Sequence, residues 1–85
     1  LHLEVARGLA LVESLAARPP AALAGHAVAS VETLDGAKLV FADESWLLFR
    51  QSGTEPVLRV YSEATSTAKM GALLDEGCRL ADSFH

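Results

Sequence analysis

The sequence predicts an α+β fold in which a four-stranded antiparallel sheet carries two helices on one face. Three observations lead to this prediction. Apolar residues recur at helical spacing near both ends of the chain. Four short segments between them are rich in β-branched and large apolar residues. The links between these segments are short, which favours consecutive antiparallel strands in the order α-β-β-β-β-α.

The first predicted helix covers residues 1–17. Its apolar residues recur three and four positions apart, at Leu1, Val5, Leu9, Val12 and Ala16, and Leu11 and Leu15 widen this stripe. The helix is expected to end before Pro19-Pro20, because a residue that precedes proline is pushed out of the helical region. The chain starts with leucine inside this expected helix, so we expect a piece of a longer protein. Residues 21–25 are small and are predicted to form a connection.

The four predicted strands are residues 26–34, 38–41, 46–50 and 57–63. Asp35-Gly36 separates the first two, and this dipeptide is typical of a two-residue hairpin turn in which both positions have positive φ. Residues 42–45 are polar and are expected to form the next turn. In the last strand Leu58, Val60 and Ser62 alternate with Arg59, Tyr61 and Glu63, which is the two-residue period of a strand.

The second helix is expected to begin after a cap supplied by Thr65, Ser66 or Thr67. Its apolar stripe is predicted to consist of Met70, Leu73, Leu74, Gly77, Leu80, Ala81 and Phe84. Arg79 lies three and four residues after two acidic side chains, which favours a surface ion pair.

The composition sets limits on function. With 85 residues, 51% of them apolar, residues 1–85 are expected to form one folded domain. The net charge of −4 argues against a general affinity for nucleic acid or for an anionic membrane surface. No apolar run of about 18 residues is present. The single Cys78 cannot form an internal disulfide, which is typical of a reducing compartment and predicts a cytoplasmic protein.

Two arginines flank the polar loop of residues 51–56. Arg50 ends one predicted strand and Arg59 lies early in the next, so an antiparallel hairpin would bring both to one mouth. Ser52 and Thr54 add hydroxyl donors, and Gly53 allows positive φ and a close backbone approach. Because guanidinium groups match pairs of phosphate oxygens, these residues suggest a phosphate or carboxylate clamp. Alternatively, this is a solvated hairpin loop whose arginines pair with Glu55 or Glu63.

The stretch from Trp46 to Ala64 strongly resembles the C-terminal domain of the α-D-phosphohexomutases, which include phosphoglucomutase, phosphomannomutase and phosphoglucosamine mutase. The family signature is Arg-Pro-Ser-Gly-Thr-Glu-Pro, with Arg-Val in the following strand. Residues 50–56 differ from it only at Gln51, where proline is usual, and a small effect on loop rigidity is expected from this change. The resemblance extends over about residues 26–84 and implies a fold like that of the TATA-box-binding protein.

The resemblance also implies roles for individual residues. Arg50, Ser52, Gly53 and Thr54 match the positions that contact the non-transferred phosphate of a hexose phosphate, and Arg59 matches a strand arginine beside that site. Glu55 is a supporting residue that would orient an arginine through a salt bridge. The parent enzyme would move phosphate between the 1- and 6-positions through a bisphosphorylated intermediate, with the other domains of the chain as partners.

The family's reactive serine segment and its Mg²⁺-binding Asp-x-Asp-x-Asp loop are both missing from this sequence, and its three histidines are dispersed. We therefore predict no catalytic residue, no metal site and no mutase activity for these 85 residues alone, although the parent enzyme is expected to use Mg²⁺. The alternatives are the same domain of a phosphoglucosamine mutase, or a non-catalytic interaction module.

Overall fold

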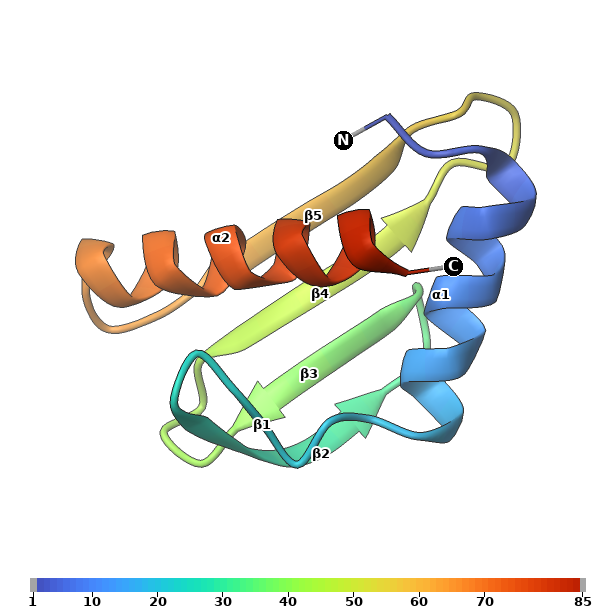
Figure 1. Ribbon diagram of the computed structural model, residues 1–85. Helices are drawn as coiled ribbons and strands as arrows, with labels where there is room; N and C mark the ends of the chain where they lie inside the picture. The colour runs from blue at the N-terminus through green and yellow to red at the C-terminus, as the bar shows by residue number, and fades with distance from the viewer. Residues whose placement is uncertain (1, 85) are drawn as a thin grey trace.

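The computed structural model describes residues 2–84 and contains two helices and five strands (Figure 1). The strands lie in the sheet in chain order, and each pairs with the next in the antiparallel sense. The elements are α1 (Val5–Ala17), β1 (Ala22–Leu23), β2 (His26–Glu32), β3 (Ala37–Phe41), β4 (Trp46–Gln51), β5 (Leu58–Glu63) and α2 (Thr67–Ser83). The α+β class and the antiparallel meander are confirmed. The predicted count of four strands is wrong, because β1 adds a fifth.

Strand β1 forms where the sequence predicted only a connection. Leu23 pairs with His26, and the two residues between them form the tight turn of the β1–β2 hairpin. Ala24 has φ 50° and Gly25 has φ 79°, so both central positions lie in the positive-φ region that such turns require. This strand has no recognisable pattern in the sequence, since Ala-Ala-Leu-Ala-Gly lacks the β-branched and aromatic residues that are typical of strands.

The Asp35-Gly36 pair is not the tight turn that was predicted. Residues 33–36 form a longer loop between β2 and β3, and Gly36 is its only residue with positive φ, at 137°. A Cβ atom placed on Gly36 would lie 2.3 Å from the carbonyl oxygen of Phe49. Glycine is needed here both for its backbone angle and for the close approach of β4.

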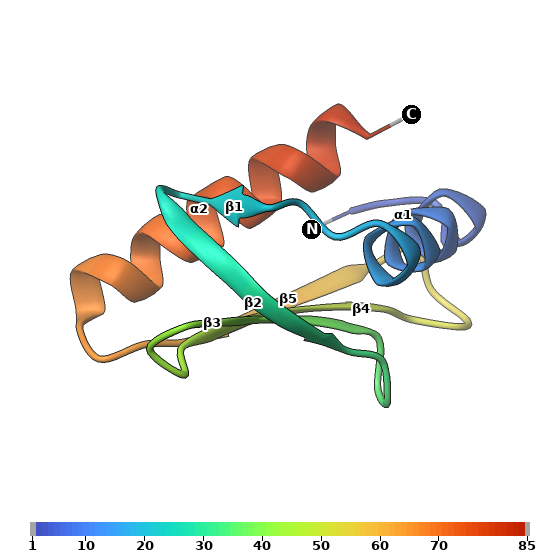
Figure 2. The ribbon, with the colours of Figure 1, turned by 90° about the horizontal axis from the view of Figure 1, so that it is seen from below.

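Both helices lie on the same side of the sheet (Figure 2). The core between the sheet and the helices draws its buried residues from the N-terminal segment, α1, β3, β4, β5 and α2, and consists of Leu3, Leu11, Leu15, Ala37, Leu39, Phe41, Leu47, Phe49, Leu58, Leu73 and Ala81. Strand β2 curls away from the plane of β3 to β5 toward the helices, and the β2–β3 register shifts between Val28 and Ser30. Such a bulge bends a strand and increases its twist.

Helix α1 begins at Val5, so the prediction that the chain starts inside a helix is wrong. Residues 2–4 run extended instead, and the Leu3 amide donates to the carbonyl of Pro56 at 2.8 Å. The predicted apolar stripe is confirmed only in part. Leu11 and Leu15 are buried and Val12 packs against the core, but Leu9 is 51% exposed, and the third buried residue of the helix is Gly8. Leu1, which began that stripe, lies outside the described residues.

Helix α2 follows the prediction closely. The Ser66 side chain accepts a hydrogen bond from the Lys69 amide and caps the first turn, and Leu73, Gly77 and Ala81 form the buried face. The predicted ion pair of Arg79 forms with Glu76 at 3.3 Å. The expected likeness to the TATA-box-binding-protein fold stays a prediction.

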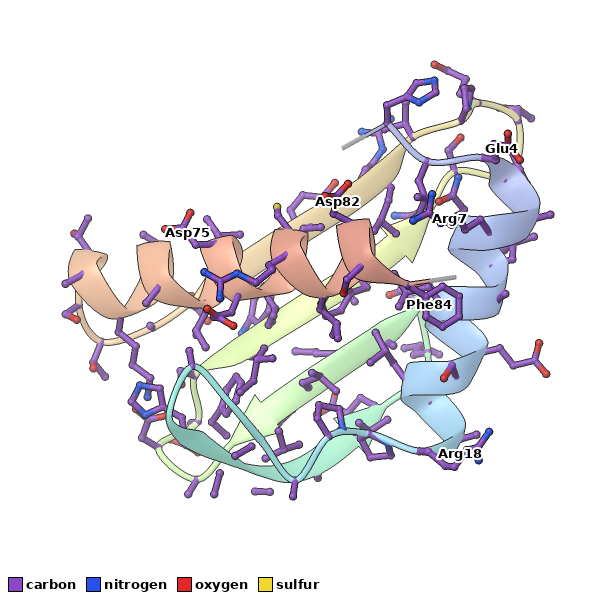
Figure 3. All side chains as sticks on the ribbon, viewed as in Figure 1. Glu4, Arg7, Arg18, Asp75, Asp82 and Phe84 are labelled. Carbon is purple, nitrogen blue, oxygen red and sulfur yellow. The ribbon has the colours of Figure 1, made fainter. Side chains whose placement is uncertain are left out.

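Arg7 of α1 holds the C-terminal end of α2, and Figure 3 shows its side chain lying toward Phe84. Its Nε donates to the Phe84 carbonyl at 2.7 Å and its Nη2 to the Asp82 carbonyl at 2.9 Å. The last carbonyls of a helix lack intrahelical partners and carry partial negative charge. Arg7 therefore caps one helix from the other and fixes their relative position.

Candidate functional site

The predicted phosphate loop joins β4 to β5 at one edge of the molecule. Gln51 and Leu58 form the last pair of the ladder, and the Ser52 amide then donates to the Val57 carbonyl at 3.0 Å. The residues between them form a polar loop that is mostly exposed. Antiparallel pairing thus carries both strand ends to the same mouth, as the sequence predicted.

Arg50 and Arg59 are direct partners in the β4–β5 register. Each lies between residues that face the helices, so both arginines point to the opposite face of the sheet, where both are exposed. Side chains at such positions have Cβ atoms about 4.5–5.5 Å apart, and like charges placed there destabilise the pair. Within residues 2–84, neither guanidinium forms an ion pair with Glu55 or Glu63.

A hollow of about 350 Å³ opens beside this pair of arginines. It is lined by Arg50, Gln51, Ser52, Gly53, Arg59 and Tyr61. Four of the five predicted phosphate contacts therefore meet at one cavity, and Thr54 is the one that does not line it. Tyr61 is an addition that the sequence reasoning missed, although its position two residues after Arg59 on one strand face could have revealed it.

The loop backbone is arranged around the Ser52 side chain. Its Oγ accepts hydrogen bonds from the amides of Thr54 at 3.4 Å and Glu55 at 3.2 Å. The Ser52 hydroxyl proton remains available to a ligand, because an oxygen that accepts can still donate. Gly53 does not have the positive φ that was anticipated, and no atom lies within 4 Å of the position its Cβ would take. The absence of a side chain at Gly53 leaves open space beside the hollow.

Glu55 does not play its predicted supporting role in this structure. Its carboxylate makes no salt bridge to either arginine in the described part of the chain. Its backbone is used instead, since its carbonyl accepts from the Val57 amide at 2.7 Å and from Gln51 Nε2 at 3.3 Å. Glu55 therefore shapes the loop through main-chain contacts.

Gln51 has a larger part than its predicted small effect on rigidity. Its side chain is buried, and Nε2 donates to the carbonyls of Leu3 at 3.4 Å and Glu55 at 3.3 Å. It thereby ties the extended N-terminal segment to the loop. A Cβ atom on Gly8 would lie 1.7 Å from Gln51 Oε1, so this glutamine occupies the space left by a helix glycine.

Two polar clusters outside the loop have structural explanations. In the β3–β4 turn, Asp43 accepts hydrogen bonds from Lys69 and from the side chain and amide of Ser45. The Lys69 hydrogen bond, followed by those of Ser45, holds the pKa of Asp43 far below its usual range. On the exposed sheet face, Trp46 Nε1 donates to Glu63 at 3.0 Å, and Lys38 Nζ lies 4.6 Å from the centroid of the Trp46 ring.

Neither of these clusters gathers metal ligands. Among residues 2–84, no three side chains of His, Cys, Asp and Glu lie close enough together to hold a metal ion. Trp46 itself is half-buried. Over the same range, neither helix is long and apolar enough to cross a bilayer.

Comparison with known proteins agrees with the motif in the loop. Residues 5–80 match the family model of the phosphoglucomutase/phosphomannomutase C-terminal domain. A phosphoglucomutase/phosphomannomutase of Thermococcus kodakarensis is 44% identical over 52 residues, which are 61% of this chain and 11% of that protein. A phosphoglucosamine mutase of Methanococcus aeolicus is 46% identical over 52 residues, with the same coverage of 61% and 11%.

A third relative, a phosphopentomutase of Thermococcus kodakarensis, is 38% identical over 48 residues, covering 56% of this chain and 11% of that protein. The chain thus matches about a tenth of the length of each of these curated relatives. The family model, in contrast, spans most of the chain. The chain therefore belongs to the family of phosphoglucomutase/phosphomannomutase C-terminal domains.

Proposed function

We propose that this domain binds the non-transferred phosphate of a hexose phosphate. Arg50 and Arg59 hold the phosphate oxygens, with the Ser52 hydroxyl and the Gly53 amide as further donors. Thr54, which does not line the hollow, would contribute only after the loop adjusts. Glu55 supports the loop through its backbone carbonyl.

The direct pairing of Arg50 with Arg59 carries this proposal. Two like charges on adjacent strands repel each other, and the described residues supply no carboxylate that would relieve the repulsion. A dianion bound between them turns this repulsion into two charge-assisted contacts. The alternative of a solvated hairpin with paired arginines lacks support, because neither of its two expected ion pairs forms within residues 2–84.

In the parent enzyme, we propose that this site serves an intramolecular phosphotransfer from the 1- to the 6-position. The bisphosphorylated intermediate must turn around between the two transfers, so one phosphate is always idle. A clamp that holds the idle phosphate positions the sugar for the reacting groups on the other domains, and positioning accounts for much of phosphoryl-transfer catalysis. The reaction would also use Mg²⁺, and we assign no ligand for that ion to this chain. We expect the enzyme to act in the cytoplasm.

The preferred sugar is left open between two classes. A phosphoglucosamine mutase is as good a parent as a phosphoglucomutase/phosphomannomutase, because relatives of both names match with 44–46% identity. A site that contacts mainly phosphate would serve either substrate. The third candidate, a non-catalytic interaction module, predicts no phosphosugar binding at the loop.

Backbone-amide NMR of the ¹⁵N-labelled chain tests the proposal. Titration with glucose 1-phosphate should shift the amides of Ser52, Gly53 and Thr54, and free glucose should leave them unmoved. Arg50→Ala should weaken binding at least tenfold without altering the rest of the spectrum. Arg18→Ala removes an equal charge from an exposed position at the end of α1 and should leave the affinity unchanged.

An equal loss of affinity in Arg50→Ala and Arg18→Ala would show that binding depends only on net charge, and this would contradict a specific phosphate clamp. An unaltered affinity in Arg50→Ala would favour the interaction module. We also expect the 85-residue chain alone to leave glucose 1-phosphate unconverted. Formation of glucose 6-phosphate by the pure chain would refute that expectation.

A further inference from the structure

Tyr61 lines the hollow but has no part in the phosphate clamp. It follows Arg59 by two residues on β5 and therefore stands on the same face of the sheet. It is 42% exposed, and it is the only tyrosine in the chain. Among residues 2–84, no hydrogen bond, ion pair or ring contact engages its side chain.

The exposed sheet face changes character step by step along the β4–β5 ladder. At the loop end stands the Arg50–Arg59 pair, next comes Leu48 opposite Tyr61, and then Trp46 opposite Glu63. Successive positions on one face of a strand are about 7 Å apart. A charged pair suited to phosphate is thus followed by an apolar, aromatic pair one step further along the same surface.

Trp46, the other aromatic residue of this face, already has interaction partners within the domain. Trp46 donates to Glu63, and Lys38 lies over its ring. Tyr61 instead presents a free ring to a cavity whose volume of about 350 Å³ is within the range of small-molecule sites. A single phosphate group would leave part of such a cavity to the organic group attached to it.

We propose that Tyr61 is the sugar-contacting residue of this site, with the sugar ring of the bound hexose phosphate lying against the phenol ring beside Leu48. The inference rests on the proposed function, because the arginine pair must first hold the phosphate. One face of a pyranose ring is lined by C–H bonds, which pack on an aromatic face without directional hydrogen bonds. Such a contact tolerates the sugar in either orientation, and it separates a phosphosugar from inorganic phosphate.

Three ligands and two variants test this role. Wild-type protein should bind glucose 1-phosphate about 2- to 10-fold more tightly than inorganic phosphate, the gain expected of one aromatic contact. Tyr61→Thr removes the ring but keeps a residue of high strand propensity, and it should abolish this preference while leaving the affinity for inorganic phosphate unchanged. Tyr61→Phe keeps the ring and should retain the preference. Free glucose should bind none of them.

A second readout needs no variant. With ring-¹³C-labelled tyrosine, the chain gives the signals of a single residue, and these should move with glucose 1-phosphate far more than with inorganic phosphate.

Trp46→Phe is the matched control for the affinity measurements, because it changes the other aromatic residue on the same sheet face. It should leave the affinities for glucose 1-phosphate and for inorganic phosphate unchanged.

The outcomes separate the two proposals. If inorganic phosphate shifts the loop amides but the phosphosugar preference is absent, or is the same in Tyr61→Thr, the role of Tyr61 is overturned and the clamp stands. If neither phosphate nor glucose 1-phosphate shifts the loop amides, the clamp fails, and the role of Tyr61 fails with it.

Discussion

Arg50 and Arg59 face each other directly across the β4–β5 ladder, on the side of the sheet turned away from α1 and α2. This pairing places two positive charges side by side, which does not stabilise the folded domain when no ligand is bound. Binding sites often store such unfavourable contacts, which the ligand then relieves. The relationship leads to a prediction about stability that is independent of any affinity measurement.

Arg59→Gln should stabilise the ligand-free domain by about 0.2–1 kcal/mol at low salt, because it removes a like-charge cross-strand pair. Added salt should reduce the difference in unfolding free energy between Arg59→Gln and wild type, because it screens the repulsion between the two arginines. Millimolar phosphate should reverse the order, since a ligand that binds only the folded state stabilises only the wild type. Urea unfolding followed by the fluorescence of Trp46, the only tryptophan, measures all three effects. A variant that is less stable than wild type in phosphate-free, low-salt buffer would contradict the prediction.

Arg7→Gln should lower the free energy of unfolding by about 1–2 kcal/mol. The substitution removes both hydrogen bonds from the guanidinium to the carbonyls of Asp82 and Phe84, and bonds from charged donors are the stronger ones. It also removes a positive charge from the C-terminal end of α2. Arg18→Gln is the matched control, because Arg18 is exposed at the far end of α1 (Figure 3). Equal losses in the two variants would show that the contact to α2 contributes nothing.

Most of the sheet and all of α2 could be predicted from the sequence because local signals agree there with the final packing. Leu58, Val60 and Ser62 alternate with exposed residues as expected, and Ser66 caps the helix that follows. In α1 the local signal is ambiguous, since several stripes of apolar residues are possible. The stripe that is buried contains Gly8, which packs on Gln51, a residue 43 positions away in the sequence (51 − 8). No periodicity could reveal that contact.

In the candidate site, too, some features could be predicted from local sequence signals and others depend on long-range contacts. The closeness of Arg50 and Arg59 follows from antiparallel strands joined by one loop, and it was predicted. Their exact pairing depends on how many loop residues remain outside the ladder, which turn composition does not fix. The attachment of the loop to Leu3 through Gln51 could not be predicted either, because the apolar pattern predicts a helix over residues 2–4, which are extended in the structure.

Because Gly8 packs against Gln51, we expect Gly8→Ala to change stability in opposite directions with and without the Gln51 side chain. In wild type, Gly8→Ala gains about 1 kcal/mol of helix propensity but drives a methyl group into a buried side chain, which costs about 1–3 kcal/mol. We expect a net loss of stability. In the background of Gln51→Ala, the obstruction is gone and the same substitution should stabilise the domain by about 1 kcal/mol. Urea unfolding of the four proteins of this cycle measures the coupling, and additive effects would refute it.

The turn at Asp43 predicts how the domain responds to acid. Lys69 and Ser45 lower the pKa of the folded-state carboxyl, so the folded protein holds the charged form more strongly than the unfolded chain does. The stability that this charge contributes is complete above the unfolded pKa of about 3.9 and is lost as the pH falls toward the lower folded-state value. Asp43→Asn imitates the protonated form and keeps an oxygen that can accept from the Ser45 amide. Wild type should therefore be more stable than this variant at pH 7, and the difference should shrink progressively below about pH 4.

Asp75→Asn is the matched control for that comparison, because it removes the same charge from an exposed position on α2, the helix that carries Lys69 (Figure 3). Its difference from wild type gives the effect of removing one exposed negative charge, with which the Asp43→Asn difference is compared. Lys69→Gln should behave like Asp43→Asn, because the first and largest cause of the lowered pKa is then absent. Urea unfolding of wild type and the three variants at a series of pH values from 2.5 to 7 gives the three differences in stability as functions of pH. A difference between wild type and Asp43→Asn that stays constant over this range would show that the carboxylate gains nothing from Lys69 in the folded state.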